Sequence, residues 1–320
     1  MKREQEYIVV FLFILVLLVP ALALPGQQQA KGQKVLTQTS REDVMSPQPA
    51  AEVSLAVKKR IGFALRLHGG MNYLQGGQLN EGIAGFVQRY EQGAESAGRP
   101  YESVSDPLHL CYEAGADLLV FFGPRFGLSL GAAYLKGRQQ SGVDITWPLY
   151  TFTVDFNREV EAIPVTLGLF YHLPLGKKFN LVFEAGGGYT FARLYMEQLA
   201  AAQLEYSNQY STGRAGGLNF YARLGLEARM TRGVFIFAET LGRVAKISNF
   251  RGSAKLVSSS SPDESFDGAF FFFDLDHQGR LFHILDFGVS AWDNPEVSNA
   301  VLAEIDFSGV SVRAGVRFRF

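Results

Sequence analysis

Few residues in this 320-residue chain have side chains suited to metal binding or nucleophilic catalysis. The single cysteine, Cys111, cannot form an internal disulfide, and its being alone excludes a zinc site built from cysteines. The histidines show neither HxH nor HxxxH spacing, so no local pair could share a metal ion. They are His68, His109, His172, His277 and His283. We therefore predict no metal site and no cofactor.

The most suggestive pair for catalysis is His109 with Glu113, four residues apart. In an extended strand such residues lie on the same face, and a histidine beside a carboxylate could act as a general base. The sequence places no serine beside them, however, and Cys111 on the same face is better explained as a small filler. We predict that the protein has no catalytic residues and is not an enzyme.

Ten polar residues recur at alternate positions of otherwise apolar or glycine-rich segments, so they would all face one interior. They are Arg66, His68, Glu113, Asp117, Glu184, Arg223, Glu227, Glu239, Arg243 and Arg313. Arg229 and Arg317 are expected near a rim. The charges nearly cancel, which fits either a salt-bridged plug or a narrow, gated ion path. We favour the plug, because the interior of an eight-stranded barrel is just wide enough for side chains to fill.

The segments that carry these residues alternate with a period of two. They cover about 60–73, 109–122, 126–136, 161–173, 179–195, 218–230, 234–246 and 305–320. In the first, Phe63, Leu65 and Leu67 form one face and Arg66 and His68 the other. Most are longer than the usual five or six residues of a soluble strand and reach the roughly 9–11 needed to span a bilayer. The pattern predicts eight spanning strands.

The connections between these strands alternate in length. Short ones cover 123–125, 174–178 and 231–233, whereas long ones cover about 74–108, 137–160, 196–217 and 248–303. The face without charge carries leucine, valine, phenylalanine and tyrosine, the opposite polarity to a soluble barrel. We predict an all-β fold: an eight-stranded antiparallel transmembrane up-and-down β-barrel with long extracellular loops.

In two strands the alternation alone does not settle which side chains face inward. In 234–246 we place Glu239 and Arg243 inward together with Phe235 and Phe237, because a charge on the lipid face costs a few kcal/mol at mid-membrane depth. In the last strand the apolar residues Ile305 and Phe307 occupy odd-numbered positions, whereas from Val310 onward they occupy even-numbered ones. We therefore expect a bulge at Ser308–Gly309, which would bring both sets into the strand.

The fourth long connection, 248–303, contains two apolar runs, Phe270–Phe273 and Leu281–Phe287, around a turn at His277–Gly279. Such runs predict a hairpin. It either extends barrel strands above the membrane, folds over the mouth as a lid, or adds two spanning strands to give ten. The acidic residues of this connection fit no calcium-binding loop, and we interpret them as solvating.

The start of the chain predicts a targeting segment. Lys2 and Arg3 precede an apolar run, 8–19, followed by Pro20 and the small-residue exit Ala21–Ala23. This order is typical of a secretory signal peptide. We expect a signal peptide at 1–23, a flexible periplasmic lead at 24–59 and the barrel at 60–320.

The closing segment, Ser308–Phe320, resembles the last strand of small Gram-negative outer-membrane proteins, and Ile163–Leu169 is similar to a strand common in the broad outer-membrane β-barrel group of OmpA-like, OmpX-like and OmpW-like proteins. The resemblance covers about 60–320. It implies an outer-membrane location, and it implies that Phe318 and Phe320 form the C-terminal signal read by the barrel-assembly machinery. That group shares no catalytic motif.

A net charge of −1 gives no basic excess and argues against a nucleic-acid partner. The expected partners are outer-membrane lipid and lipopolysaccharide, the barrel-assembly machinery and an unknown extracellular ligand. The predicted function is that of a surface, structural or binding barrel with a side-chain-filled lumen, in the outer membrane of a Gram-negative-type cell after signal-peptide cleavage. The alternatives are an OmpW-like channel for small or apolar solutes and, least favoured, an enzyme that modifies lipid A.

Overall fold

The computed structural model describes residues 61–203, 205–290 and 294–320. The expected signal peptide and lead, 1–59, lie outside the described residues. Within the described part, 14 strands and one helix form a single sheet system.

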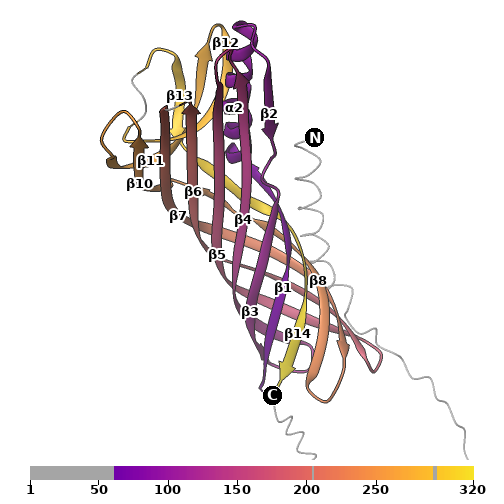
Figure 1. Cartoon of the computed structure of the whole chain (residues 1–320). Coiled ribbons are helices and arrows are strands. Elements are labelled where there is room, and N and C mark those ends of the chain that lie inside the picture. The colour runs from indigo at the N-terminus through magenta and orange to yellow at the C-terminus, as the bar shows by residue number, and fades with distance from the viewer. Residues whose placement is uncertain (1–60, 204, 291–293) are drawn as a thin grey trace, which may run out of the picture. The chain divides into compact units, whose positions relative to one another are not determined.

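Eight strands close into a ring (Figure 1). Around it lie β1 (Gly62–Gly77), β3 (Leu110–Phe121), β4 (Phe126–Thr146), β5 (Thr151–Leu175), β6 (Phe179–Ala202), β7 (Glu205–Arg229), β8 (Val234–Val244) and β14 (Glu304–Arg319). Each pairs antiparallel with its neighbours, and β14 closes the ring by pairing with both β8 and β1. The predicted eight-stranded antiparallel barrel is confirmed, and the ten-stranded option is wrong.

The two faces of the ring have the predicted polarity. Exposed apolar side chains point outward on all eight strands and form a band around the ring; examples are Leu67, Leu118, Leu130, Leu167, Phe191, Leu224, Ile236 and Val312. The charged positions alternate with them and are buried inside. Phe235, Phe237, Glu239 and Arg243 all face inward, as expected for β8. An apolar outer band around a closed ring is the surface of a membrane-spanning barrel.

The last strand contains the expected bulge. The register of β14 against β1 advances by three residues, from Asp306 to Gly309, while β1 advances by two, from Gly76 to Leu74. Ile305 and Phe307 are therefore buried, whereas Val310 is exposed.

At one end of the barrel the strands join through short turns near 122–125, 176–178 and 230–233; we call this the turn end. At the opposite end β4, β5, β6 and β7 continue well beyond the apolar band, to lengths of 21, 25, 24 and 25 residues. The segments 137–160 and 196–217, expected to be loops, are thus largely strand. Most of their buried positions are small or apolar, as with Ser141, Val143 and Val154, but they include the charged Arg158.

The first long connection holds a helix that the sequence analysis missed. α2 (Gln78–Ser96) buries Leu79, Ile83, Phe86 and Val87, which recur at helical spacing. β2 (Tyr101–Ser105) follows it and pairs with β4. Among the described residues, no helix is long and apolar enough to cross a membrane.

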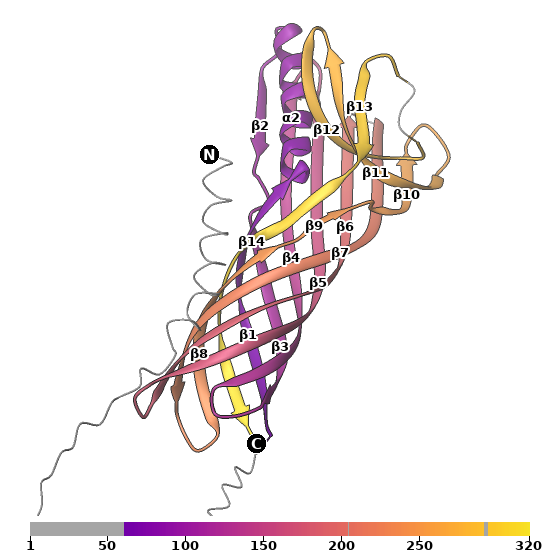
Figure 2. The same ribbon diagram turned by 180° about the vertical axis from the view of Figure 1, so that it is seen from behind.

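The fourth long connection extends the sheet. β9 (Lys246–Ser248) pairs with β14, and β10 (Arg251–Ser258) pairs with the far part of β7. β11 (Glu264–His277) and β12 (Arg280–Gly288) form the predicted hairpin, β11 pairs with β10, and β13 (Val297–Leu302) pairs with β11. The hairpin therefore extends the sheet beyond the ring, as Figure 2 shows from behind.

We call α2, β10–β13 and the extensions of β4–β7 the cap. Its α2 packs closely on β12: a Cβ at Gly85 would collide with the backbone carbonyl of His283, and one at Gly82 would collide with Leu285. Glycine at these two positions lets the helix and strand backbones approach. The core of the cap is apolar and includes Phe86, Phe156, Phe250, Phe270, Phe273, Ile284, Leu285 and Phe307.

Candidate functional site

The ten polar residues predicted to face inward all lie inside the ring, and each is at least nine-tenths buried. They come from β1, β3, β6, β7, β8 and β14, so their side chains converge from around the barrel. The register explains this: Arg66 on β1 is directly opposite Asp117 on β3, and Arg313 on β14 is directly opposite Glu239 on β8.

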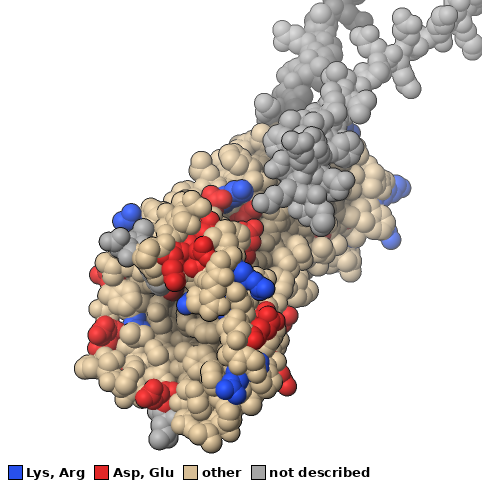
Figure 3. Space-filling view, turned by 90° about the horizontal axis from the view of Figure 1, so that it is seen from above, with Lys and Arg blue, Asp and Glu red and all other residues tan. Residues whose placement is uncertain are grey.

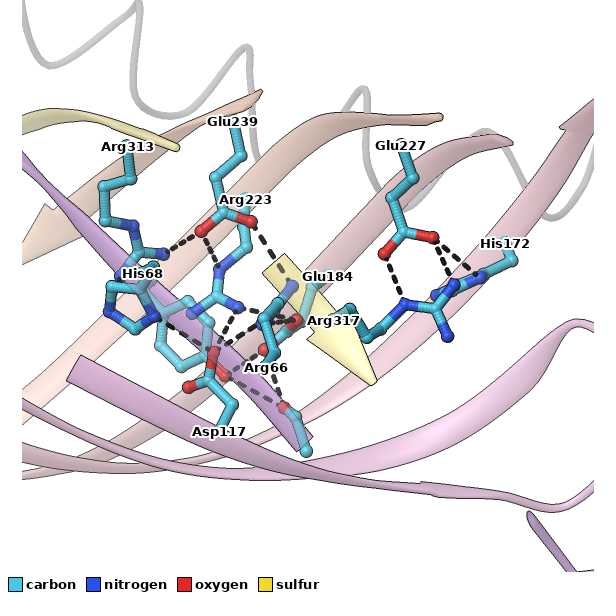
Figure 4. A network of polar contacts seen from close by, with 12 residues as sticks. Arg66, His68, Asp117, His172, Glu184, Arg223, Glu227, Glu239, Arg313 and Arg317 are labelled. Carbon is cyan, nitrogen blue, oxygen red and sulfur yellow. Dashed lines mark hydrogen bonds and ion pairs between the residues drawn. The ribbon is translucent and has the colours of Figure 1, made fainter. Parts of the chain in front are cut away.

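Arg66 lies at the centre of the main network (Figure 4). Its Nε donates to Oδ2 of Asp117 at 2.8 Å, its Nη2 to Oε2 of Glu184 at 3.0 Å, and its Nη1 to Oε2 of Glu239 at 3.3 Å. One guanidinium thus joins carboxylates from three other strands, using the fork of donors that lysine lacks.

Arg223 binds the same carboxylates from the opposite side of the ring. Its Nη1 lies 3.2 Å from Asp117 and 3.1 Å from Glu184, and its Nε lies 3.6 Å from Glu239. The two arginines and three carboxylates therefore form one cluster that crosses the lumen.

The network continues toward the cap through Glu113. Arg313 spans the two parts, with Nη2 at 2.7 Å from Glu239 and Nη1 at 3.1 Å from Glu113. Arg243 donates to Glu113 at 3.2 Å. His68 joins the same region, with Nδ1 at 3.6 Å from Asp117 and Nε2 at 3.2 Å from Arg313.

A second group lies nearer the turn end. Glu227 accepts two hydrogen bonds from Arg317, at 2.8 and 2.7 Å, and lies 3.7 Å from His172 (Figure 4). Arg317 was expected near the rim and lies toward the turn end; it is almost fully buried, and its guanidinium lies 3.9 Å from the ring centre of Phe235.

Neutral partners that the sequence analysis did not single out complete the network. Ser129 and Tyr221 donate to Glu184 at 2.6 and 2.8 Å, and Asn72 and Ser311 donate to Glu113. Five buried arginines therefore face five buried carboxylates, and hydroxyl and amide groups donate further hydrogen bonds to Glu113 and Glu184. The pairing offsets the cost of removing these charges from water.

A small cavity lies within the network. Beside His68, Glu113, Asp117 and Arg223 lies a cavity of about 10 Å³, room for roughly one water molecule. Charged side chains from six strands meet inside the ring, which is the arrangement that the predicted plug requires.

A second closure follows at the cap. Leu74, Leu79, Phe250, Phe270, Leu285 and Phe307 are each at most 2% exposed and pack with one another across the mouth of the ring. An ion that passed the charged layer would meet this dry layer, where its desolvation is costly.

The suggested His109–Glu113 pair does not form. The Nδ1 atom of His109 lies 2.8 Å from the Leu74 carbonyl, and its ring stacks on the outward ring of Tyr73. Glu113 instead binds Arg243 and Arg313 inside the lumen. Cys111 is buried and free.

The acidic residues of the fourth connection have local partners. Asp263 lies 2.8 Å from Lys255, and Asp274 binds His283 at 2.7 Å and Asn299 at 2.8 Å. Within the described part of the chain, no three His, Cys, Asp or Glu side chains gather as metal ligands would. From the cap end, acidic and basic side chains are interspersed over a mostly uncharged surface (Figure 3).

A groove of about 360 Å³ opens at the cap surface between α2 and the β12 hairpin. Gln88, Glu91, Gln92, Glu95, Arg280, Leu281 and Phe282 line it. Gln92 is nine-tenths buried, and its Oε1 accepts no hydrogen bond among the described residues.

No protein-family model and no curated protein matches the chain. Among solved structures, the crystal structure of the outer membrane protein OprG from Pseudomonas aeruginosa is similar, at 13% identity and a TM-score of 0.38, covering 82% of this chain and 97% of that one. Because that superposition is loose, the outer-membrane barrel architecture rests on the strand pairing and the apolar band of this chain itself.

Proposed function

We propose that this protein is a closed outer-membrane barrel that anchors a folded cap at the cell surface, where the cap binds an extracellular partner. The observation that carries the proposal is the double closure of the interior, first by the charged network and then by the apolar core of the cap. A through-path would require both layers to separate.

The charged layer resists separation because its members are shared. Arg66 alone contacts three carboxylates, and each of these also contacts Arg223. Removing one partner from a buried ion pair typically costs about 3–5 kcal/mol. Such a lumen supports the barrel structurally rather than conducting solutes.

Two segments of the sequence support the proposed location. The apolar run at 8–19 with the Ala21–Ala23 exit would direct secretion and be removed, and Phe318 and Phe320 would present the closing strand to the barrel-assembly machinery. Short turns facing the periplasm and long elements facing outward are the usual orientation of such barrels. In this orientation the cap and its groove face the cell exterior.

Cysteine labelling on intact cells tests this orientation. Gln88→Cys places a thiol in the exposed groove, and Lys177→Cys places one at the turn end. We expect a membrane-impermeant maleimide to label the Gln88→Cys variant and to leave Lys177→Cys unlabelled until the cells are broken. The reverse pattern would place the cap in the periplasm.

Liposome swelling in arabinose tests closure. Vesicles with the refolded protein should swell no faster than protein-free vesicles, with a general porin as the positive control. Swelling that depends on the folded barrel would instead support the alternative of a channel for small solutes.

A further inference from the structure

Three arginines form a row across the outer face of the sheet, just beyond the apolar band. Arg193 on β6 is directly opposite Arg214 on β7, and Arg214 is directly opposite Arg251 on β10. All three are exposed. The three strands lie side by side where the barrel meets the cap (Figure 1).

This arrangement is unfavourable in isolation, because like charges directly opposite each other destabilise a strand pair. Among the described residues, no carboxylate forms an ion pair with any of the three. The next residue of the row, Glu161, is directly opposite Arg193, but it lies 3.5 Å from Lys136 and accepts a hydrogen bond from Tyr134 at 2.6 Å. The described part of the chain therefore leaves the row without an ion-paired counter-charge.

The depth of the row is fixed by its neighbours. Two positions toward the turn end along β6 lies Phe191, and two further lies Tyr189, both exposed members of the apolar band. Outward tyrosines gather at the level of the lipid headgroups. The arginines thus lie at the depth where lipid phosphates are found.

We propose that Arg193, Arg214 and Arg251 bind the phosphate groups of an anionic lipid in the outer leaflet. Each guanidinium presents a fork of donors that matches two phosphate oxygens, and a phosphate bound between neighbouring arginines supplies the counter-charge that the row lacks. The assignment to the outer leaflet depends on the orientation proposed above; phosphate binding itself does not.

The test compares two triple variants of the full chain. R193Q/R214Q/R251Q removes the row, and R125Q/K177Q/K178Q removes three exposed positive charges at the turn end. Native mass spectrometry of the detergent-solubilised protein measures binding of diphosphorylated lipid A and of dephosphorylated lipid A. We expect the row variant to bind the phosphorylated lipid about 100-fold more weakly, at roughly 1 kcal/mol per basic residue. The control should change less than threefold, and the dephosphorylated lipid should not distinguish the proteins.

Thermal unfolding in vesicles gives a second readout. In zwitterionic vesicles the row variant should be at least as stable as the wild type, because repulsion is removed; added lipid A should stabilise the wild type and not the variant. Equal lipid A binding by the wild type and the row variant would overturn the proposal, as would equal losses in both triple variants. Inorganic phosphate that competes fully at millimolar concentration would overturn the assignment to a lipid. The mass measurement uses solubilised protein and does not depend on the orientation of the barrel in the membrane. If the proposed orientation is wrong, only the Gln88→Cys labelling will show it.

Discussion

At the scale of single residues, Arg66 is the side chain whose loss should matter most to the barrel. Arg66→Met leaves Asp117, Glu184 and Glu239 with fewer counter-charges in a space closed to water. We expect a loss of about 3–5 kcal/mol in the free energy of unfolding. Urea titration in detergent measures it, with the exposed Arg138→Met as control, expected to change by less than about 0.5 kcal/mol. Equal stability of both variants would contradict the role assigned to the network.

Cys111 offers a direct check of packing at the barrel mouth. Its side chain is fully buried among the core residues of the cap. We expect no reaction with a maleimide in the folded protein and full reaction in urea, whereas Ser253→Cys on the exposed face of β10 should react at once. Rapid labelling of Cys111 in the folded state would show that the mouth is open.

Asp286 makes the cap sensitive to pH. Burial raises the pKa of this carboxyl to about 6, opposed by the hydrogen bond from the Phe287 amide and by Arg158. Because the pKa is higher in the folded than in the unfolded chain, stability falls as pH rises through the window from about 4 to 6 and is level on either side. The free energy of opening of the β12 amides, measured by hydrogen exchange and corrected for the intrinsic exchange rate, should therefore be higher at pH 4 than at pH 7 by about 2–3 kcal/mol.

The Asp286→Asn variant is the control for this dependence, since an amide does not titrate. Its β12 amides should lose most of the change between pH 4 and pH 7. A wild-type cap whose exchange, corrected for the intrinsic rate, is the same at both pH values would contradict the assignment to Asp286.

At the scale of elements, two glycines of α2 should respond in opposite directions. Gly85→Ala forces a methyl group against the His283 carbonyl and should weaken cap docking by about 1–3 kcal/mol. Gly93→Ala meets no neighbouring atom and should stabilise the helix by up to about 1 kcal/mol. Limited proteolysis of α2 measures both, and equal behaviour of the two variants would show that α2 does not pack on β12 as described.

The elements differ in how well the sequence predicted them. The spanning strands were predictable because outward residues such as Leu65 and Leu67 must be apolar and their inward neighbours need not be. α2 was missed although Leu79, Ile83, Phe86 and Val87 recur at helical spacing, because the segment lies between strands and was treated as a loop. The extensions of β4–β7 were missed because above the membrane their outward side is polar, which removes the alternation of a lipid-facing strand.

The polar interior was predictable as a set but not as a network. The alternation of side chains along each strand places Arg66 and Asp117 inside the barrel. The register between neighbouring strands then decides which carboxylate each arginine pairs with. Arg317 lies toward the turn end, where it was expected, but its pairing with Glu227 depends on the positions of β14 and β7 around the ring. The arginine row could not be seen in the sequence, since Arg193, Arg214 and Arg251 come together only through the pairing of three strands.

At the scale of the whole molecule, the proposed protein is a barrel that is closed at two levels and supports a folded cap. The charged layer contributes rigidity within the membrane band, and the apolar layer joins α2, the β12 hairpin and the ends of the ring strands. A conducting state would need both layers to rearrange together, so single substitutions in one layer should not open a path.

Single-channel recording in planar bilayers tests this claim most directly. The refolded full chain and its Arg66→Ala variant are compared at the same protein density, with a general porin to show that the bilayer reports openings. We predict that both proteins are silent, because in the variant the apolar layer still closes the mouth. Steady, discrete openings of the wild type that change in size with Arg66→Ala would contradict the account and place Arg66 on a conducting path.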